Sequence, residues 1–252
     1  MERFSETGFA TIPIFTQDEI SLLRSKITNA SLNFPMYNGD SIPDPIAFPE
    51  FAFLKDIIED SRIVNNVKAA LGPNIRFVGH NDIGFNRVVG WHKDRLNNQY
   101  NEYEKTPIWG PEAMLPNTGF GIVKVAIYFQ DHSSNNHAMK VIPNSYKTPA
   151  PTVIRSSSHY VRNQTILQLK PKIGEILIFE QRSTHRGQVR PTNSETNSPL
   201  RNSRILLSIG YGRKNVFSDE FERGTVARQT DQKSMLKTTK KQTKMETEVE
   251  TK

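Results

Sequence analysis

Seven short stretches rich in β-branched and aromatic residues follow Pro73, with turn residues between them. They are Ile75–Val78, Ile83–Val89, Ile122–Gln130, Met139–Ile142, Thr165–Leu169, Ile176–Phe179 and Ile205–Tyr211. Residues of these types favour strands because their side chains pack well on a pleated surface. Strands this short, joined by connections of very different length, predict a mainly β protein with a jelly-roll or cupin-like barrel.

The first part of the chain shows helical patterns instead. Thr16 and Glu19 have the spacing of a capping box, with Thr at the N-cap and Glu at N3, so a helix is expected over Gln17–Asn29. Two shorter helices are expected over Phe51–Glu59 and Ser61–Leu71. These helices should flank the barrel on its N-terminal side.

The length and composition are sufficient for one folded unit. With 252 residues, 36% of them hydrophobic, the chain can bury one sizeable core. We expect a single domain over residues 1–218, helical to about residue 73 and a barrel over about 74–218. Residues 219–252 are rich in Lys, Thr, Gln and Glu, which predicts a disordered tail, or at best a frayed helix.

The charge and the absence of cysteine limit the possible functions. The formal net charge is +7, but residues 223–252 hold eight Lys and Arg against four Asp and Glu, so roughly half of the surplus lies in the tail. No nucleic-acid-binding motif occurs, and no stretch reaches 18 uninterrupted apolar residues. We therefore expect a cytoplasmic protein without a nucleic-acid or membrane partner. Because there is no cysteine, any metal must be held by His, Asp or Glu.

A candidate metal site begins in Gly90-Trp91-His92-Lys93-Asp94. On an extended segment His92 and Asp94 lie on one face, since side chains alternate with period 2. A second histidine, His185, follows the apolar stretch Ile176–Phe179. Two His and one carboxylate form the ligand set of non-haem Fe(II) oxygenases, so we predict His92, Asp94 and His185 as the metal ligands.

The other histidines are weaker candidates. His80-Asn81-Asp82 has the same spacing, but it lies in a segment rich in Gly and Asn. His132 lacks a comparable acidic partner, and His137 and His159 lie among Ser and Asn residues. We interpret all four as structural or solvated side chains.

An Fe(II) site of this kind needs a co-substrate that supplies electrons, usually a 2-oxo acid. The far carboxylate of 2-oxoglutarate requires a cation, and Arg suits it because its planar fork matches a carboxylate bidentately. Arg204 opens the last predicted strand and is the first candidate. Arg201 and Lys124, in the middle of the strand Ile122–Gln130, are the alternatives.

Four separate blocks of the sequence resemble the phytanoyl-CoA dioxygenase family of Fe(II)- and 2-oxoglutarate-dependent oxygenases. The blocks are GFATIPIFTQDEISLLRSKI, WHKD, VAIYFQDHSSNNHAMKVIPNSYKTP and GEILIFEQRSTHRG with the strand from Arg204. The resemblance covers roughly residues 6–212. It implies a double-stranded β-helix core, Fe(II) held by His92, Asp94 and His185, and 2-oxoglutarate anchored by Arg204.

Some positions depart from the family pattern. Asn144 and Tyr146 stand where the family usually has Gly and His, and His137-Ala138 replaces a common Gly-Gly. None of these positions is a predicted metal ligand. The connection from His185 to Arg204 is also longer than usual, which keeps Arg201 in consideration.

The resemblance implies a dioxygenase that hydroxylates a small organic substrate with O2 and releases succinate and CO2. No catalytic residue beyond the metal site is expected. Substrate contacts are expected from the long connection after Asp94, at Arg95, Tyr100, Tyr103 and Trp109. Two alternatives are a catalytically inactive cupin-like protein that binds a metal or sugar, and a basic nucleic-acid-associated module that uses the tail from Arg223.

Overall fold

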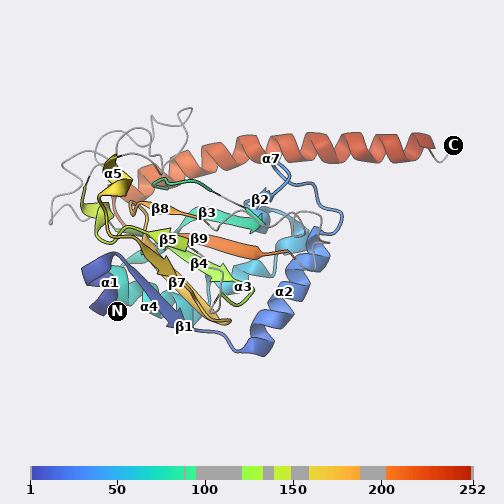
Figure 1. The fold of residues 1–252 in the computed structure, drawn as a ribbon. Coiled ribbons are helices and arrows are strands. Elements are labelled where there is room, and N and C mark those ends of the chain that lie inside the picture. The colour runs from blue at the N-terminus through green and yellow to red at the C-terminus, as the bar shows by residue number, and fades with distance from the viewer. Residues whose placement is uncertain are drawn as a thin grey trace.

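The computed structural model describes residues 2–87, 89–94, 121–132, 139–148, 159–187 and 203–250. Two antiparallel sheets form its centre, and helices from the N-terminal part cover one of them (Figure 1). The chain therefore has the mainly β architecture with flanking N-terminal helices that the strand pattern predicts.

The helical elements before the barrel are α1 (Glu2–Thr7), α2 (Gln17–Ser31), η1 (Pro45–Ala47), η2 (Pro49–Phe51), α3 (Leu54–Ile58) and α4 (Ser61–Leu71). Of the three expected helices, α2 and α4 begin at the expected residues, whereas the one expected over Phe51–Glu59 is shorter, at α3. The elements α1, η1 and η2 were not predicted. The capping box at α2 is confirmed, since the Glu19 amide donates to the Thr16 hydroxyl at 3.2 Å and the Thr16 amide donates to the Glu19 carboxylate at 2.7 Å. At α4 the N-cap is Asp60, whose carboxylate accepts from the Arg62 amide, and the helix begins at Ser61 as expected.

The larger sheet has six strands in the order β1-β7-β4-β9-β3-β2. Their bounds are Phe9–Pro13 (β1), Ser41–Pro43 (β2), Ile75–Phe85 (β3), Ile122–Tyr128 (β4), Glu175–Glu180 (β7) and Ile205–Arg213 (β9). The smaller sheet has the order β6-β5-β8, with β5 at Met139–Val141, β6 at Leu167–Leu169 and β8 at His185–Arg186. Two short helical turns, η5 (Ser145–Lys147) and α5 (His159–Arg162), follow β5 in the chain. This arrangement is the double-stranded β-helix.

Strand alternation divides the interior into two parts. On β4, Val123, Val125 and Ile127 join the core that packs under the N-terminal helices. Ala126 and Tyr128 of the same strand face the smaller sheet and join a second cluster with its apolar residues. Side chains at alternate positions of β4 and β9 therefore point between the two sheets, where they line a cavity.

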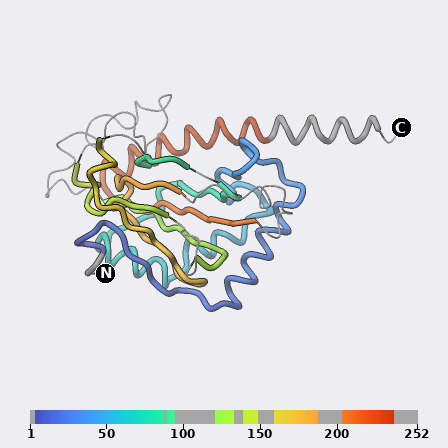
Figure 2. Tube along the Cα trace, viewed as in Figure 1, coloured from blue at the N-terminus to red at the C-terminus, as the bar shows by residue number. Residues whose placement is uncertain are grey.

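The C-terminal part of the chain forms one helix, α7 (Val216–Glu250). It crosses the edge of the large sheet at β3 and β2 (Figure 2). Phe221 is 1% exposed and packs against Val78 and Ile122. Over residues 219–236 the chain thus forms a helix packed on the barrel, where the composition predicts a disordered tail or at best a frayed helix. Composition suggested disorder because the helix has few large apolar residues, but two of them, Phe221 and Leu236, are buried and anchor it to the barrel.

Polar contacts with the barrel also hold α7. Arg76 on β3 pairs with Asp219, at 2.6 Å, and with Glu222. Further along the helix, the Gln229 amide donates to the Asn81 carbonyl at 3.0 Å, and Lys233 pairs with Asp44. Among the described residues, no helix is both long enough and apolar enough to span a bilayer.

Candidate metal centre

The three predicted metal ligands lie together at one end of the cavity. Their ligand atoms are all within 4.8 Å of one another, and they are the one group of at least three His, Cys, Asp or Glu side chains in the described part of the chain that could hold a metal ion. Asp94 Oδ1 is 3.2 Å from His92 Nε2 and 3.6 Å from His185 Nε2. The structure therefore brings together residues 91 positions apart in the way that the sequence predicts.

Backbone pairing fixes the two histidines relative to each other. The His92 amide donates to the His185 carbonyl at 2.8 Å, and the His185 amide donates to the His92 carbonyl at 2.9 Å. Next to His92, the buried Trp91 ring packs with Ile142 and Val161 and anchors the segment. Both imidazoles thus project from opposed positions of one antiparallel bridge, with ring centroids 4.3 Å apart.

Each imidazole has its Nδ1 turned away from the shared point. Nδ1 of His92 lies 2.7 Å from the Gly90 carbonyl oxygen, and Nδ1 of His185 lies 2.9 Å from the Ser183 carbonyl oxygen. A carbonyl oxygen can only accept, so Nδ1 of each ring carries a proton and Nε2 faces the shared point. At that point His92 Nε2 also lies 3.2 Å from Asp94 Oδ1, so in the absence of metal it can donate to this carboxylate. Such carbonyl partners orient metal-binding histidines and fix their tautomer.

The electrostatics suit a divalent cation. Burial, together with the nearby His92, lowers the pKa of His185 to about 4, so this ligand is neutral at pH 7. Burial disfavours the charged form of Asp94, but Lys124 and the two histidines outweigh it and hold the pKa of Asp94 well below its usual value. Burial likewise opposes protonation of His92, yet its hydrogen bond with Asp94 raises the pKa of His92 above 6.5. A metal ion must displace that proton to bind.

Two residues that the sequence reasoning missed position the ligands. Lys93, between His92 and Asp94, points to the opposite face of the segment, where its buried ammonium donates to the carbonyls of Ser145 and Arg182. Gln181 donates from its side-chain amide to the Asp94 carbonyl. For Lys93 the signal was available, because strand alternation that unites positions 92 and 94 must send position 93 the other way.

The co-substrate candidates occupy different parts of the same cavity. Arg204 and Lys124 both line it. Lys124 lies at the metal end, with its ammonium 3.9 Å from Asp94 Oδ2. On β9, Gly210 pairs with Lys124 and Leu206 with Tyr128, so Arg204 lies towards the other end of β4. Asn86 holds the Arg204 backbone, since its side-chain oxygen accepts from the Arg204 amide at 2.8 Å.

Several predicted site residues lie outside the described residues. They are Arg201, the alternative anchor, and the four candidate substrate contacts Arg95, Tyr100, Tyr103 and Trp109. These assignments stay predictions.

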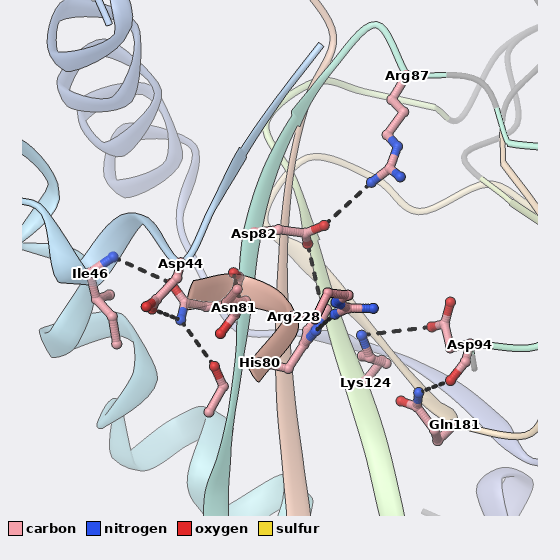
Figure 3. Close-up of polar contacts among 12 residues, drawn as sticks. Asp44, Ile46, His80, Asn81, Asp82, Arg87, Asp94, Lys124, Gln181 and Arg228 are labelled. Carbon is pink, nitrogen blue, oxygen red and sulfur yellow. Dashed lines mark hydrogen bonds and ion pairs between the residues drawn. The ribbon is translucent and has the colours of Figure 1, made fainter. Parts of the chain in front are cut away.

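The remaining described histidines do not join the metal ligands. His159 is exposed and His132 is 1% exposed. His80 is buried and lines the cavity, with Nε2 3.6 Å from Asp82 Oδ1. Arg228 of α7 donates towards His80 Nδ1 at 3.2 Å, an interaction that Figure 3 shows beside Lys124 and Asp94. The prediction that His80 is a structural histidine agrees with its burial, but its place in the cavity was not anticipated.

Asn144 also accounts for one departure from the family pattern. Its φ of 59° lies in the left-handed region, where Gly is usual and Asn is the next most tolerant residue. Tyr146 packs its ring over Gly8, where an added Cβ would come within 2.6 Å of it. The unusual turn therefore keeps its backbone conformation and gains a contact with the start of β1.

Comparison with known proteins identifies structural relatives. No protein-family model matches the sequence, and no curated protein matches it. The solved structure of EctD from S. alaskensis, with 2-oxoglutarate and 5-hydroxyectoine, matches with a TM-score of 0.61 and 16% identity over 83% of this chain and 73% of that chain. HygX from Streptomyces hygroscopicus, with nickel, 2-oxoglutarate and hygromycin B, matches with a TM-score of 0.59 and 18% identity over 84% and 86%.

A third structure matches to a similar extent. The non-haem α-ketoglutarate-dependent epimerase SnoN from nogalamycin biosynthesis has a TM-score of 0.59 and 12% identity, over 84% of this chain and 81% of that chain. At these identities the likeness shows that the chain shares its fold with these proteins.

Proposed function

We propose that this protein is an Fe(II)- and 2-oxoglutarate-dependent dioxygenase of the phytanoyl-CoA dioxygenase type, which hydroxylates a small organic substrate and releases succinate and CO2. The observation that carries the proposal is the convergence of His92, Asp94 and His185 inside a double-stranded β-helix. The structural neighbours support it, because HygX and EctD were solved with 2-oxoglutarate in the same fold.

The donor set fits Fe(II). Two neutral imidazole nitrogens and one ionised carboxylate form the facial triad of non-haem Fe(II) oxygenases, which leaves positions open for co-substrate and oxygen. The hydrogen bonds from Nδ1 to backbone carbonyls meet the further requirement that both imidazoles present Nε2 to the metal. When bound, the iron supplies oxygen activation coupled to decarboxylation of 2-oxoglutarate.

Arg204 is the proposed anchor for the far carboxylate of 2-oxoglutarate. Its guanidinium fork suits a carboxylate, and it lines the cavity away from the metal end. Lys124 suits this role less well, because its ammonium already lies against the metal ligand Asp94. Arg204 would then hold the far carboxylate of a diacid whose keto acid end binds the metal.

The residues of this chain position the reacting groups in the cavity and limit the access of water to them. The cavity has a volume of about 300 Å³, at the lower end of the usual range for small-molecule sites. Phe179, Met139 and Tyr128 supply apolar surface to its lining, so reacting groups are held in a water-poor environment. No protein base is required for hydroxylation of a C–H bond, and none is assigned.

The test measures succinate formed from 2-oxoglutarate by the full-length protein with Fe(II) and O2. Turnover without added substrate suffices, because enzymes of this kind decarboxylate 2-oxoglutarate slowly on their own. His92→Ala and Asp94→Ala should each abolish iron-dependent succinate formation, whereas His159→Ala, at an exposed histidine, should leave it unchanged. Circular dichroism of each variant verifies folding. Undiminished succinate formation in either ligand variant would refute the proposal, and its complete absence from the wild-type protein would favour an inactive metal-binding homologue.

A further inference from the structure

Arg204, the proposed anchor for 2-oxoglutarate, lies directly before β9 begins at Ile205. Its backbone therefore lies outside the strand ladder that holds the rest of β9. A cation that is already held in place binds a carboxylate more tightly, because less conformational freedom is lost on binding. The position of the anchor thus depends on contacts other than the ladder.

Asn86, directly after β3, binds the backbone of the anchor. Its amide donates to the Arg204 carbonyl and its side-chain oxygen accepts from the Arg204 amide, both at 2.8 Å. Its side-chain nitrogen donates to the Ser203 hydroxyl at 3.0 Å. The side-chain oxygen of Asn86 thus takes the place that a backbone carbonyl has in an antiparallel ladder. Both polar backbone groups of Arg204 are bound by this one residue.

The backbone conformation of Asn86 suits this arrangement. Its φ of 52° lies in the left-handed region, which Asn tolerates better than most residues. The chain can therefore leave the direction of β3 at this residue while the side chain continues the pairing. After this turn the chain leads to the segment with His92 and Asp94, so Asn86 lies between β3 and the candidate metal ligands and is bonded to the anchor.

Two further side chains hold the neighbouring peptide groups. Arg24 on α2 donates from its guanidinium to the Ser203 carbonyl at 2.6 Å and to the Phe129 carbonyl at 3.0 Å. Gln130, after β4, accepts from the Ile205 amide at 2.9 Å through its side-chain oxygen. The peptide groups on both sides of the anchor are therefore held from α2 and β4 as well as from β3.

We propose that Asn86 is a positioning residue for the co-substrate, which holds Arg204 in place for the far carboxylate of 2-oxoglutarate, and that Arg24 and Gln130 assist it. This inference rests on the proposed function, because it requires Arg204 to be the anchor. Asn86 acts through Arg204 and does not touch the co-substrate itself. Its loss therefore weakens the binding of oxo acids that carry a far carboxylate and leaves the metal end of the site unchanged.

The experiment measures co-substrate binding to the full-length, Ni(II)-loaded protein by calorimetry. Asn86→Gly removes the side chain but keeps a residue that accepts the left-handed conformation. It should weaken 2-oxoglutarate binding by about threefold to tenfold, the effect of losing one or two neutral hydrogen bonds. Asn38→Gly is the matched control, because Asn38 has the same φ of 52° and is exposed, and it should bind 2-oxoglutarate as the wild type does.

A second oxo acid distinguishes positioning from a general loss of structure. 2-Oxobutyrate has the same keto acid end as 2-oxoglutarate but lacks the far carboxylate. Its affinity, and the affinity for Ni(II), should be the same in Asn86→Gly as in the wild-type protein. A merely structural role would weaken the binding of both oxo acids alike.

A double-mutant cycle tests whether Asn86 acts through Arg204. In the Arg204→Met background, Asn86→Gly should have no further effect on 2-oxoglutarate binding, because no guanidinium remains to be positioned. Arg24→Met removes the hydrogen bonds from α2 and should show the same selective loss. It therefore tests the same role if Asn86→Gly does not fold.

Three results would overturn the positioning role. Asn86→Gly binds 2-oxoglutarate as Asn38→Gly does, or it weakens 2-oxobutyrate binding equally, or its effect is the same with and without the Arg204 guanidinium. The proposed function survives each of them as long as Arg204→Met binds 2-oxoglutarate more weakly than the wild type. An unchanged affinity in Arg204→Met would overturn both the anchor and its positioning, and failure of the wild-type protein to bind 2-oxoglutarate would contradict the proposed function itself.

Discussion

Truncating Phe221 tests whether α7 is an integral part of the fold. Its side chain is 1% exposed and packs with Val78 and Ile122, both fully buried. A buried Phe→Ala substitution costs about 3–5 kcal/mol, through lost transfer energy and the cavity it leaves. For a protein of this size, each kcal/mol lowers the melting temperature by about 2–4 °C, so Phe221→Ala should melt roughly 6–20 °C lower.

The assay combines thermal unfolding with hydrogen exchange, both in the presence of a chelator, because bound metal would shift the apparent stability. If α7 detaches locally before the barrel unfolds, faster exchange of amides over residues 216–236 will report it instead of the melting temperature. Val226→Ala is the control, at a 50% exposed position on the same helix. The packing argument is refuted if Phe221→Ala matches this control in both measurements.

Three further predictions concern the metal centre and its co-substrate. Lys93→Met should weaken Ni(II) binding, measured by calorimetry, by about tenfold. The substitution removes the hydrogen bonds to the Ser145 and Arg182 carbonyls that hold the segment between the candidate ligands in place. Lys147→Met, at an exposed lysine, is the control and should bind Ni(II) as the wild type does. Because Asp94 raises the pKa of His92 above 6.5, Ni(II) affinity should increase with pH through that region as the competing proton is lost, and a flat profile between pH 6 and 8 would contradict the assignment. Arg204→Met should weaken 2-oxoglutarate binding by about tenfold to a hundredfold, with Arg204→Lys intermediate because the charge remains but the fork is lost; equal affinities would exclude this anchor.

The parts of the fold that sequence could predict are those governed by local periodicity. The strands at 122–128 and 205–213 follow from β-branched and aromatic runs, and the start of α2 follows from the capping box at Thr16 and Glu19. The two strands expected at 75–78 and 83–89 instead belong to one strand, β3 (Ile75–Phe85). The candidate metal ligands were also accessible, since the period of a strand places His92 and Asp94 on one face, and His185 follows shortly after the apolar run Ile176–Phe179. Each of these inferences needed only residues close together in the chain.

The parts that sequence could not predict depend on contacts between distant residues. Arg228 and His80 are 148 positions apart, as are Gln229 and Asn81, and no local pattern links either pair. The composition of residues 219–236 resembles a solvated segment because the helix packs through two buried apolar side chains, Phe221 and Leu236, and several polar contacts. Lys93 is the instructive intermediate case, since alternation predicts its direction but not the two carbonyls that it reaches.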